Sequence, residues 1–275
     1  MNTFFELSNK EKLHLIFGEN YKFITDGLLL GQDNMDFDFS QVELLSKETN
    51  SPFVFRFYGW RPYCLSLGYN QNDENVNKLA LNNLGYDLVR RPTGGRAVFH
   101  SDEITYSCIV NLDIINQRLK ENDFAEFDLT NQTATKYNHR DFYRDIHLIL
   151  IEILSQINGL SDKLDYSKKD ANFNNHYKDK TSMSCFSSSA RYEITHQNKK
   201  IVGSAQRLFG NILLQHGSIL LGREHLNIVN LLNLNDDEKS NHKTILENLS
   251  ISISELCNRE VEYNEVIKKV NDYFY

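Results

Sequence analysis

The stretch Arg90–Tyr106, RRPTGGRAVFHSDEITY, joins a charged turn to the start of an apolar strand. Two adjacent glycines, Gly94 and Gly95, let the backbone turn sharply and come close to a ligand. Arginine side chains suit phosphate and carboxylate groups, and three of them lie within seven residues here. The alternative is an ordinary hairpin turn with solvated arginines, and the pattern alone favours that alternative.

Strands and helices follow one another irregularly on both sides of this turn. Ile104–Val110 alternates with a period close to two, which predicts a strand. Asp141–Leu160 repeats its apolar residues every three or four positions, which predicts a helix. Asp73–Leu84 is a second expected helix, capped by Asp73 and followed by Gly85. Because regular βαβ units are missing, we predict an α+β fold, a mixed and largely antiparallel sheet flanked by helices.

A lysine opens a short apolar strand in Lys199–Gln206, KKIVGSAQ. Such a lysine could place its ammonium at the mouth of a pocket, with Gly203, Ser204 and Ala205 behind it. The turn residues Gln197–Asn198 lie between two strand-like segments and predict a hairpin. A surface lysine on that hairpin is the simpler explanation, and the pattern alone favours it.

One of the four cysteines differs from the others in its surroundings. Cys185 lies in Ser182–Ser187, SMSCFS, where a thiol could be reached, whereas Cys64 and Cys108 lie in apolar strand-like segments and Cys257 in a late helix. Structural cysteines are usually buried on apolar faces. A nearby lysine would raise the thiolate fraction of Cys185, although the pattern alone favours a role without catalysis.

Composition excludes several classes of protein. Hydrophobic residues make up 40% of the 275 residues, as in globular domains, and the net charge of −7 argues against sequence-independent binding to nucleic acid. The cysteines are widely spaced and form no CxxC pair, so we predict reduced thiols, no metal site and a cytoplasmic location. Residues 1–20 have no signal-peptide core, and no apolar stretch is long enough to span a membrane.

Several separated motifs together resemble one family, the LipM-type octanoyltransferases of the biotin/lipoate protein ligase superfamily. Arg90–Val98 with His100–Ser107 resembles the central motif of that family. Lys200–Gln206 and Leu214–Leu221 match its later strands, and Phe57–Pro62 is similar to an early one. The resemblance covers residue 21 to the C-terminus. We therefore expect an N-terminal extension over residues 1–20 and a single catalytic domain with a short helical tail over residues 21–275.

The resemblance also implies the residues of the site. The family has a nucleophilic cysteine in a Cys-Phe pair and a lysine directly before the apolar-Gly-Ser segment, which correspond to Cys185 and Lys200. The remaining matches are expected to bind substrate: Arg90, Arg91, Thr93, Gly94, Gly95, Arg96, His100, Gly203, Ser204, Ala205 and His216.

The implied activity is transfer of octanoate from octanoyl-acyl carrier protein, through a cysteine thioester, to a lysine of a lipoyl domain or of the glycine-cleavage H protein in lipoate biosynthesis. No cofactor is needed, because the donor is already an activated thioester. We expect a monomer with neither nucleic acid nor membrane as a partner. Since such carrier proteins are typically acidic, we predict that Arg90, Arg91 and Arg96, with Lys199, form a basic docking patch.

Three alternatives stay open. The first is an ATP-dependent lipoate–protein ligase on the same fold, which would not need Cys185. The second is a transferase that moves octanoate between lipoyl-carrier proteins. The third is a non-catalytic relative that binds an acyl chain or a lipoyl domain as a sensor, although the presence of both Cys185 and Lys200 argues against it.

Overall fold

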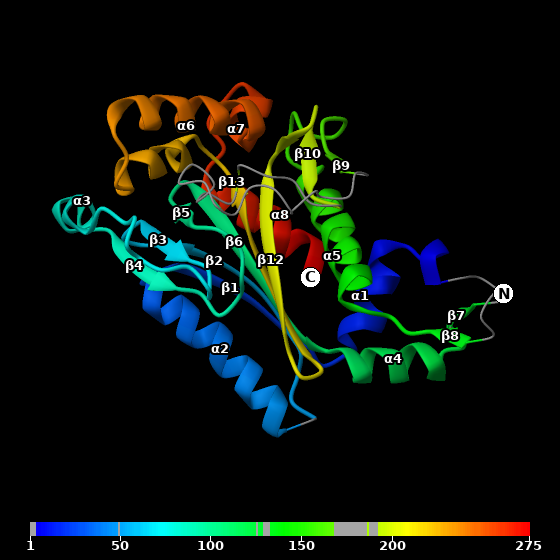
Figure 1. Cartoon of the computed structure of the whole chain (residues 1–275). Coiled ribbons are helices and arrows are strands. Elements are labelled where there is room, and N and C mark those ends of the chain that lie inside the picture. Colours follow the sequence, from blue (N-terminus) through cyan, green and yellow to red (C-terminus); the bar gives the residue numbers. More distant parts are fainter. Residues whose placement is uncertain (1–3, 49, 125, 129–132, 168–185, 187–191) are drawn as a thin grey trace.

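The computed structural model describes residues 4–48, 50–124, 126–128, 133–167, 186 and 192–275 (Figure 1). Its centre is a mixed five-stranded sheet in the order β1-β2-β6-β13-β12, in which only β1 and β2 are parallel. The bounds of these strands are β1 Lys22–Leu29, β2 Val54–Trp60, β6 Glu103–Asn111, β13 Ile212–Leu220 and β12 Val202–Phe209. This arrangement confirms the predicted α+β class.

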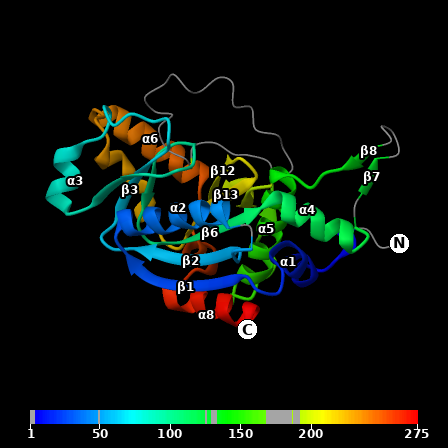
Figure 2. The same cartoon turned by 90° about the horizontal axis from the view of Figure 1, so that it is seen from below.

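Helices cover both faces of this sheet. Figure 2 shows α2 on one side of β1 and β2, and α8 on the other. The buried side chains of α1, α4, α5 and α8 form the main hydrophobic core with the sheet. The helices of the described residues are η1 Phe4–Glu6, α1 Asn9–Phe17, α2 Gly31–Lys47, α3 Lys78–Leu84, α4 Leu112–Glu121, α5 His139–Leu154, η5 Glu224–Leu231, α6 Asp236–Leu249, α7 Ile253–Cys257 and α8 Tyr263–Phe274. None of them is both long and apolar enough to cross a membrane.

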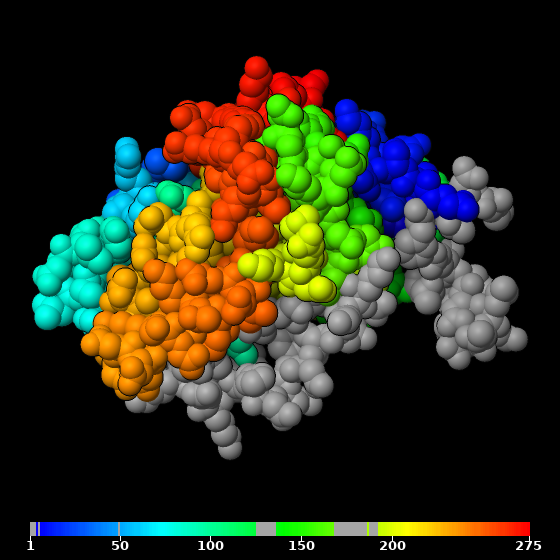
Figure 3. Space-filling view, turned by 90° about the horizontal axis from the view of Figure 1, so that it is seen from above, coloured from blue at the N-terminus to red at the C-terminus, as the bar shows by residue number. Residues whose placement is uncertain are grey.

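Three smaller sheets lie around the main one, in the orders β4-β3-β5, β11-β10-β9 and β7-β8. Their strands are β3 Cys64–Leu67, β4 Asp87–Arg90, β5 Val98–His100, β7 Glu126–Asp128, β8 Thr133–Thr135, β9 Asp165–Tyr166, β10 Ile194–His196 and β11 Lys199–Lys200. In Figure 3 the β10–β11 hairpin (yellow) lies beside α6 and α7 (orange), and Ile251 N–H donates to the Lys200 carbonyl at 3.0 Å.

Most predicted elements are present, with one local correction. The hairpin at Gln197–Asn198 is confirmed, and both of these residues have positive φ. The predicted Asp73 cap is wrong: α3 begins after Asn77, whose side chain accepts from the Ala80 N–H at 3.0 Å. The predicted end of that helix is right, because Gly85 has a left-handed φ of 66°.

Residues 1–20 contribute to the body of the domain. Three side chains of α1, those of Leu13, Ile16 and Phe17, belong to the main core, and Phe17 stacks on Phe55 of β2 with ring centroids 5.3 Å apart. The division of the chain at residue 20 stays a prediction.

Candidate active site

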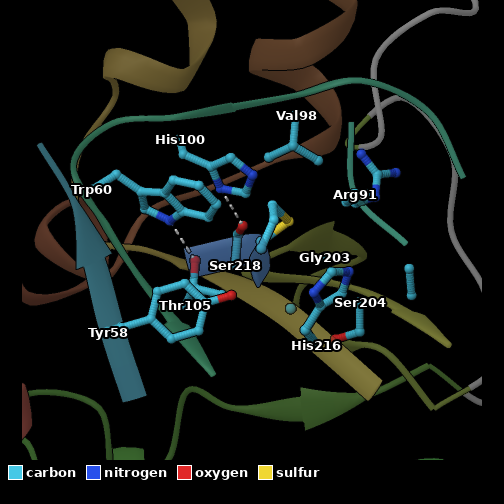
Figure 4. A pocket seen from close by; sticks show the side chains of 13 residues that line it. Tyr58, Trp60, Arg91, Val98, His100, Thr105, Gly203, Ser204, His216 and Ser218 are labelled. Atoms are coloured by element: carbon cyan, nitrogen blue, oxygen red, sulfur yellow. Dashed lines mark hydrogen bonds between the residues drawn. The ribbon is translucent and has the colours of Figure 1, made fainter. Parts of the chain in front are cut away.

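A pocket opens where α2, the main sheet and the β4–β5 loop meet (Figure 4). One part of its wall is apolar or aromatic, and the other part carries polar side chains beside small residues. The apolar and aromatic residues are Met35, Tyr58, Trp60 and Val98. The polar and small residues are Arg91, His100, Thr105, Gly203, Ser204, Ala205, His216, Gly217 and Ser218. This wall suits a ligand with an aliphatic chain and a polar head group.

Trp60 and His100 form the aromatic side of the pocket. Their rings stack with centroids 4.0 Å apart, and Trp60 Nε1–H donates to Thr105 Oγ1 at 2.8 Å. The two ring nitrogens of His100 have hydrogen-bond partners along the edge of the ring, with Nδ1 2.7 Å from Glu103 Oε1 and Nε2 2.8 Å from Ser66 Oγ. His100 is therefore held from three directions, which fixes the shape of this wall.

The arginines of the charged turn hold the turn itself together. Arg91 is 3% exposed and donates to the carbonyls of Gly94 (2.9 Å) and Arg96 (2.6 Å), while Arg90 donates to the carbonyls of Gly68 and Tyr69. The predicted docking patch is therefore wrong for Arg91 and Arg96, which are both buried. The Arg91 guanidinium binds carbonyls of its own turn, and the Arg96 side chain is buried, so neither is presented to a partner.

Glycine is required where this turn meets the strand before it. A Cβ on Gly68 would lie 2.1 Å from the Gly95 carbonyl oxygen, and Gly95 has a φ of 92°. The close approach lets the turn pack directly onto the end of β3, beside the pocket wall at Val98.

His216 connects the turn to helix α2. Its Nε2 lies 2.6 Å from Thr93 Oγ1, and its Nδ1 lies 3.7 Å from Asp38 Oδ2. Burial lowers the pKa of His216, while Asp38 acts in the opposite direction. Asp38 is fully buried and also binds Arg56 Nη1 (3.2 Å), Tyr58 Oη (3.1 Å) and Ser107 Oγ (2.8 Å). A buried carboxylate thus fixes His216 at the pocket.

Gly203–Ala205, from the segment Lys199–Gln206, lie on β12 and form the opposite wall of the pocket. Ser204 Oγ lies 2.8 Å from Tyr106 Oη and 2.9 Å from His147 Nε2. A Cβ on Gly217 of the neighbouring strand would lie 2.3 Å from this hydroxyl oxygen. The absence of a side chain at Gly217 therefore leaves space for Ser204 to reach the buried histidine.

Lys200 is buried just behind this wall. Its Nζ lies 2.7 Å from Glu193 Oε1 and 5.8 Å from the centroid of the Phe186 ring. Phe186 packs on Gly203, where an added Cβ would lie 3.0 Å from its ring. Cys185, the predicted nucleophile, lies outside the described residues.

The structure thus separates the predicted residues into two sets. Six of them line the pocket: Arg91, His100, Gly203, Ser204, Ala205 and His216. The other described ones lie around it: Arg90, Thr93, Gly94, Gly95, Arg96 and Lys200. Sequence reasoning missed further lining residues, although alternation along β13 places Ser218 on the same face as His216. It also missed Glu193, which lies two residues before Thr195, the strand partner of Lys200 in the hairpin.

Metal ligands do not gather in the part of the chain that the structure describes. No group of three His, Cys, Asp or Glu side chains there could hold a metal ion.

The sequence from Gly31 to the C-terminus matches the model of the lipoyl protein ligase A/B catalytic domain, residues 31–275. The chain belongs to the lipoyl protein ligase A/B family. Octanoyltransferase LipM of Anoxybacillus flavithermus is 32% identical to this family member over 90% of the chain and 82% of the relative. The LipM protein of Bacillus subtilis is 30% identical, over 93% of the chain and 85% of the relative. This lipoyl ligase-family protein is therefore an acyltransferase of the LipM group, as the sequence predicted.

Solved structures support the same fold for this lipoyl ligase-family protein. The bipartite lipoate protein ligase of Thermoplasma acidophilum superimposes with a TM-score of 0.58 at 16% identity, over 93% of the chain and 82% of its own. At these identities the likeness concerns the fold alone.

Proposed function

We propose that the protein transfers an octanoyl group from octanoyl-acyl carrier protein to a lysine of a lipoyl domain or of the glycine-cleavage H protein. Cys185 is the nucleophile and Lys200 its catalytic partner. The names of the LipM relatives support the octanoyl group. One observation carries the catalytic assignment: Phe186, bonded through the backbone to Cys185, packs on the pocket residue Gly203 and lies beside the buried Lys200.

The three cysteines in the described residues are poor nucleophiles. Burial raises the pKa of the Cys64 and Cys108 thiols well above the usual value, and it also raises the pKa of Cys257. A thiol with a raised pKa is protonated at neutral pH, and the thiolate is the reactive form. This supports the choice of Cys185, which the family resemblance implies.

The reaction has two balanced steps. First, the Cys185 thiolate attacks the octanoyl carbonyl carbon. A new C–S bond forms, the C–S bond of the donor thioester breaks, and the carrier sulfur leaves with that electron pair and takes a proton from the Lys200 ammonium. Then the amine of the acceptor lysine attacks the enzyme thioester, a C–N bond forms, and the Cys185 sulfur leaves. The proton lost by that amine returns to Lys200. Since the donor is already a thioester, neither ATP nor a metal is required.

An intact-mass experiment tests this proposal. The protein is mixed with octanoyl-acyl carrier protein without ATP, and its mass is recorded before and after a lipoyl domain is added. We expect an octanoyl adduct that disappears in Cys185→Ala, persists in Cys257→Ala and passes to the lipoyl domain. Transfer that needs ATP and free octanoate or lipoate would support the ligase alternative instead.

The apolar part of the pocket wall should limit the length of the acyl chain. Met35 lies in an apolar cluster with Tyr58 and Trp60 under α2, and all three line the pocket. Met35→Ala is expected to raise the ratio of decanoyl to octanoyl transfer about tenfold, because each buried methylene contributes about 0.8 kcal/mol. Competition between the two acyl donors measures this ratio. Phe39→Ala, which changes an exposed residue of the same helix, is the control, and an unaltered ratio in Met35→Ala would refute a role in chain length.

A further inference from the structure

Tyr192, directly before Glu193, has an unusual backbone conformation. Its φ is 66°, in the left-handed region, which costs a residue with a bulky side chain about 1–2 kcal/mol. Hydrogen bonds hold the bend on both sides. The Tyr192 N–H donates to the Ser167 carbonyl at 2.7 Å, and the Tyr192 carbonyl lies 2.6 Å from His147 Nδ1. A strained residue persists only where its surroundings determine it, so these contacts fix the direction in which the chain leaves Tyr192.

His147 makes the contact from helix α5, on the far side of the pocket wall. A carbonyl oxygen can only accept, so Nδ1 carries the proton and Nε2 is the acceptor. The hydroxyls of Ser204 (2.9 Å) and Tyr106 (3.1 Å) face Nε2. Burial, aided by the charge of Lys200, lowers the pKa of His147 to about 4, so the imidazole is neutral at pH 7. One ring thus joins the pocket residue Ser204 to the bend at Tyr192.

The bend directs the next side chain towards the catalytic lysine. The Glu193 carboxylate lies 2.7 Å from Lys200 Nζ, and each side chain is 4% exposed. A buried ammonium is stable only beside a partner of opposite charge that is well placed. The position of Glu193 therefore affects both the charge and the place of Lys200.

We propose that His147 is a positioning residue for Lys200. Its Nδ1–H fixes the Tyr192 carbonyl, and the bend at Tyr192 directs the Glu193 carboxylate onto the lysine ammonium. This inference rests on the proposed role of Lys200 in acyl transfer. It adds two residues, His147 and Glu193, that sequence reasoning did not assign to the site.

Two substitutions at His147 separate its two nitrogens. In His147→Asn an amide nitrogen can occupy the place of Nδ1 and still donate to the Tyr192 carbonyl. In His147→Gln the side chain reaches the place of Nε2 but loses that donor. We expect the rate of octanoyl-enzyme formation to fall about 10- to 100-fold in His147→Gln, because a small misplacement of a catalytic group costs up to about 10²-fold. His147→Asn should retain a rate clearly above that of His147→Gln.

A double variant tests the path through Glu193. Glu193→Gln should slow octanoyl-enzyme formation by a similar factor. His147→Gln combined with Glu193→Gln should then be little slower than either single variant, since the two act as one unit. Thermal unfolding of each variant checks that it is folded at the assay temperature.

Three results would overturn the inference. Equal rates in His147→Asn and His147→Gln would mean that the Nδ1 contact is not used, and multiplicative losses in the double variant would mean that His147 acts independently of Glu193. If Lys200→Met forms the octanoyl-enzyme as fast as the unaltered chain, the proposed role of Lys200 fails, and the inference fails with it. The first two results leave the proposed function intact. A failure of the inference about His147 can therefore be distinguished from a failure of the proposed function.

Discussion

Lowering the pH from 6.5 to 4 is expected to destabilise the folded protein by about 3 kcal/mol for each of two buried histidines, from about 1.4 kcal/mol per pKa unit. Burial lowers the pKa of both His147 and His225 to about 4 from an ordinary value of 6.5. Well above pH 6.5 both are neutral in the folded and in the unfolded chain. Between pH 6.5 and 4 the unfolded chain takes up protons that the folded chain does not, so stability falls as the pH falls.

Denaturant unfolding at several pH values in this window measures the effect. His225→Gln should reduce the dependence of the unfolding free energy on pH by about 1.4 kcal/mol per pH unit, the contribution of one proton. His225 is a suitable choice because it lies in η5, contacts Ser250 Oγ at 2.8 Å and is not among the residues that line the pocket, although its ring lies beside Phe186. His14→Gln, which changes an exposed histidine of α1, is the matched control. If the unfolding free energy of His225→Gln depends on pH as steeply as that of the unaltered chain, the prediction is wrong.

Local patterns predicted the framework well because the signals are themselves local. The alternation in Ile104–Val110 corresponds to a strand that lies at the centre of the sheet, β6. The turn at Gln197–Asn198 lies between two short strands, and Gly85 ends α3 in the left-handed conformation. Each of these features depends on residues within a few positions of one another. The Asp73 cap failed because Asn77 competes for the same role, and Asp73 instead pairs with Lys78 at 2.6 Å.

The candidate site was harder to predict because its contacts join distant segments. The motif residues were predicted, but their burial was not. Arg91 donates to Ser66 of β3 and to the Gly94 carbonyl of its own turn, so it is not an exposed contact for a partner. His147 and Tyr192 are 45 positions apart, and no periodicity links them. A lone histidine on an apolar helix face carries no signal of its function in the sequence.

Asp38 lies at the junction of helix α2, the main sheet and the pocket, and its replacement by alanine is expected to cost about 3–5 kcal/mol of folding stability. Its carboxylate is fully buried and accepts from Arg56, which is itself fully buried. Arg56 keeps its contacts with Asp26 Oδ2 at 2.6 Å and Asn34 Oδ1 at 2.8 Å, but Asp26 is partly exposed and Asn34 carries no charge. Without the Asp38 carboxylate, Arg56 Nη1 and the hydroxyls of Tyr58 and Ser107 would face a cavity.

The same substitution should affect the pocket through His216, whose Nδ1 faces Asp38. Denaturant unfolding measures the stability, and Asp36→Ala, on the exposed face of the same helix, is the control. Asp38→Leu combined with Arg56→Met should cost much less than the sum of the two single changes, because a buried pair replaced as a whole leaves no uncompensated charge. Additive costs would mean that Asp38 stabilises the fold mainly through Tyr58, Ser107 and His216. In that case its retention in the core would reflect the shape of the pocket rather than the charge of Arg56.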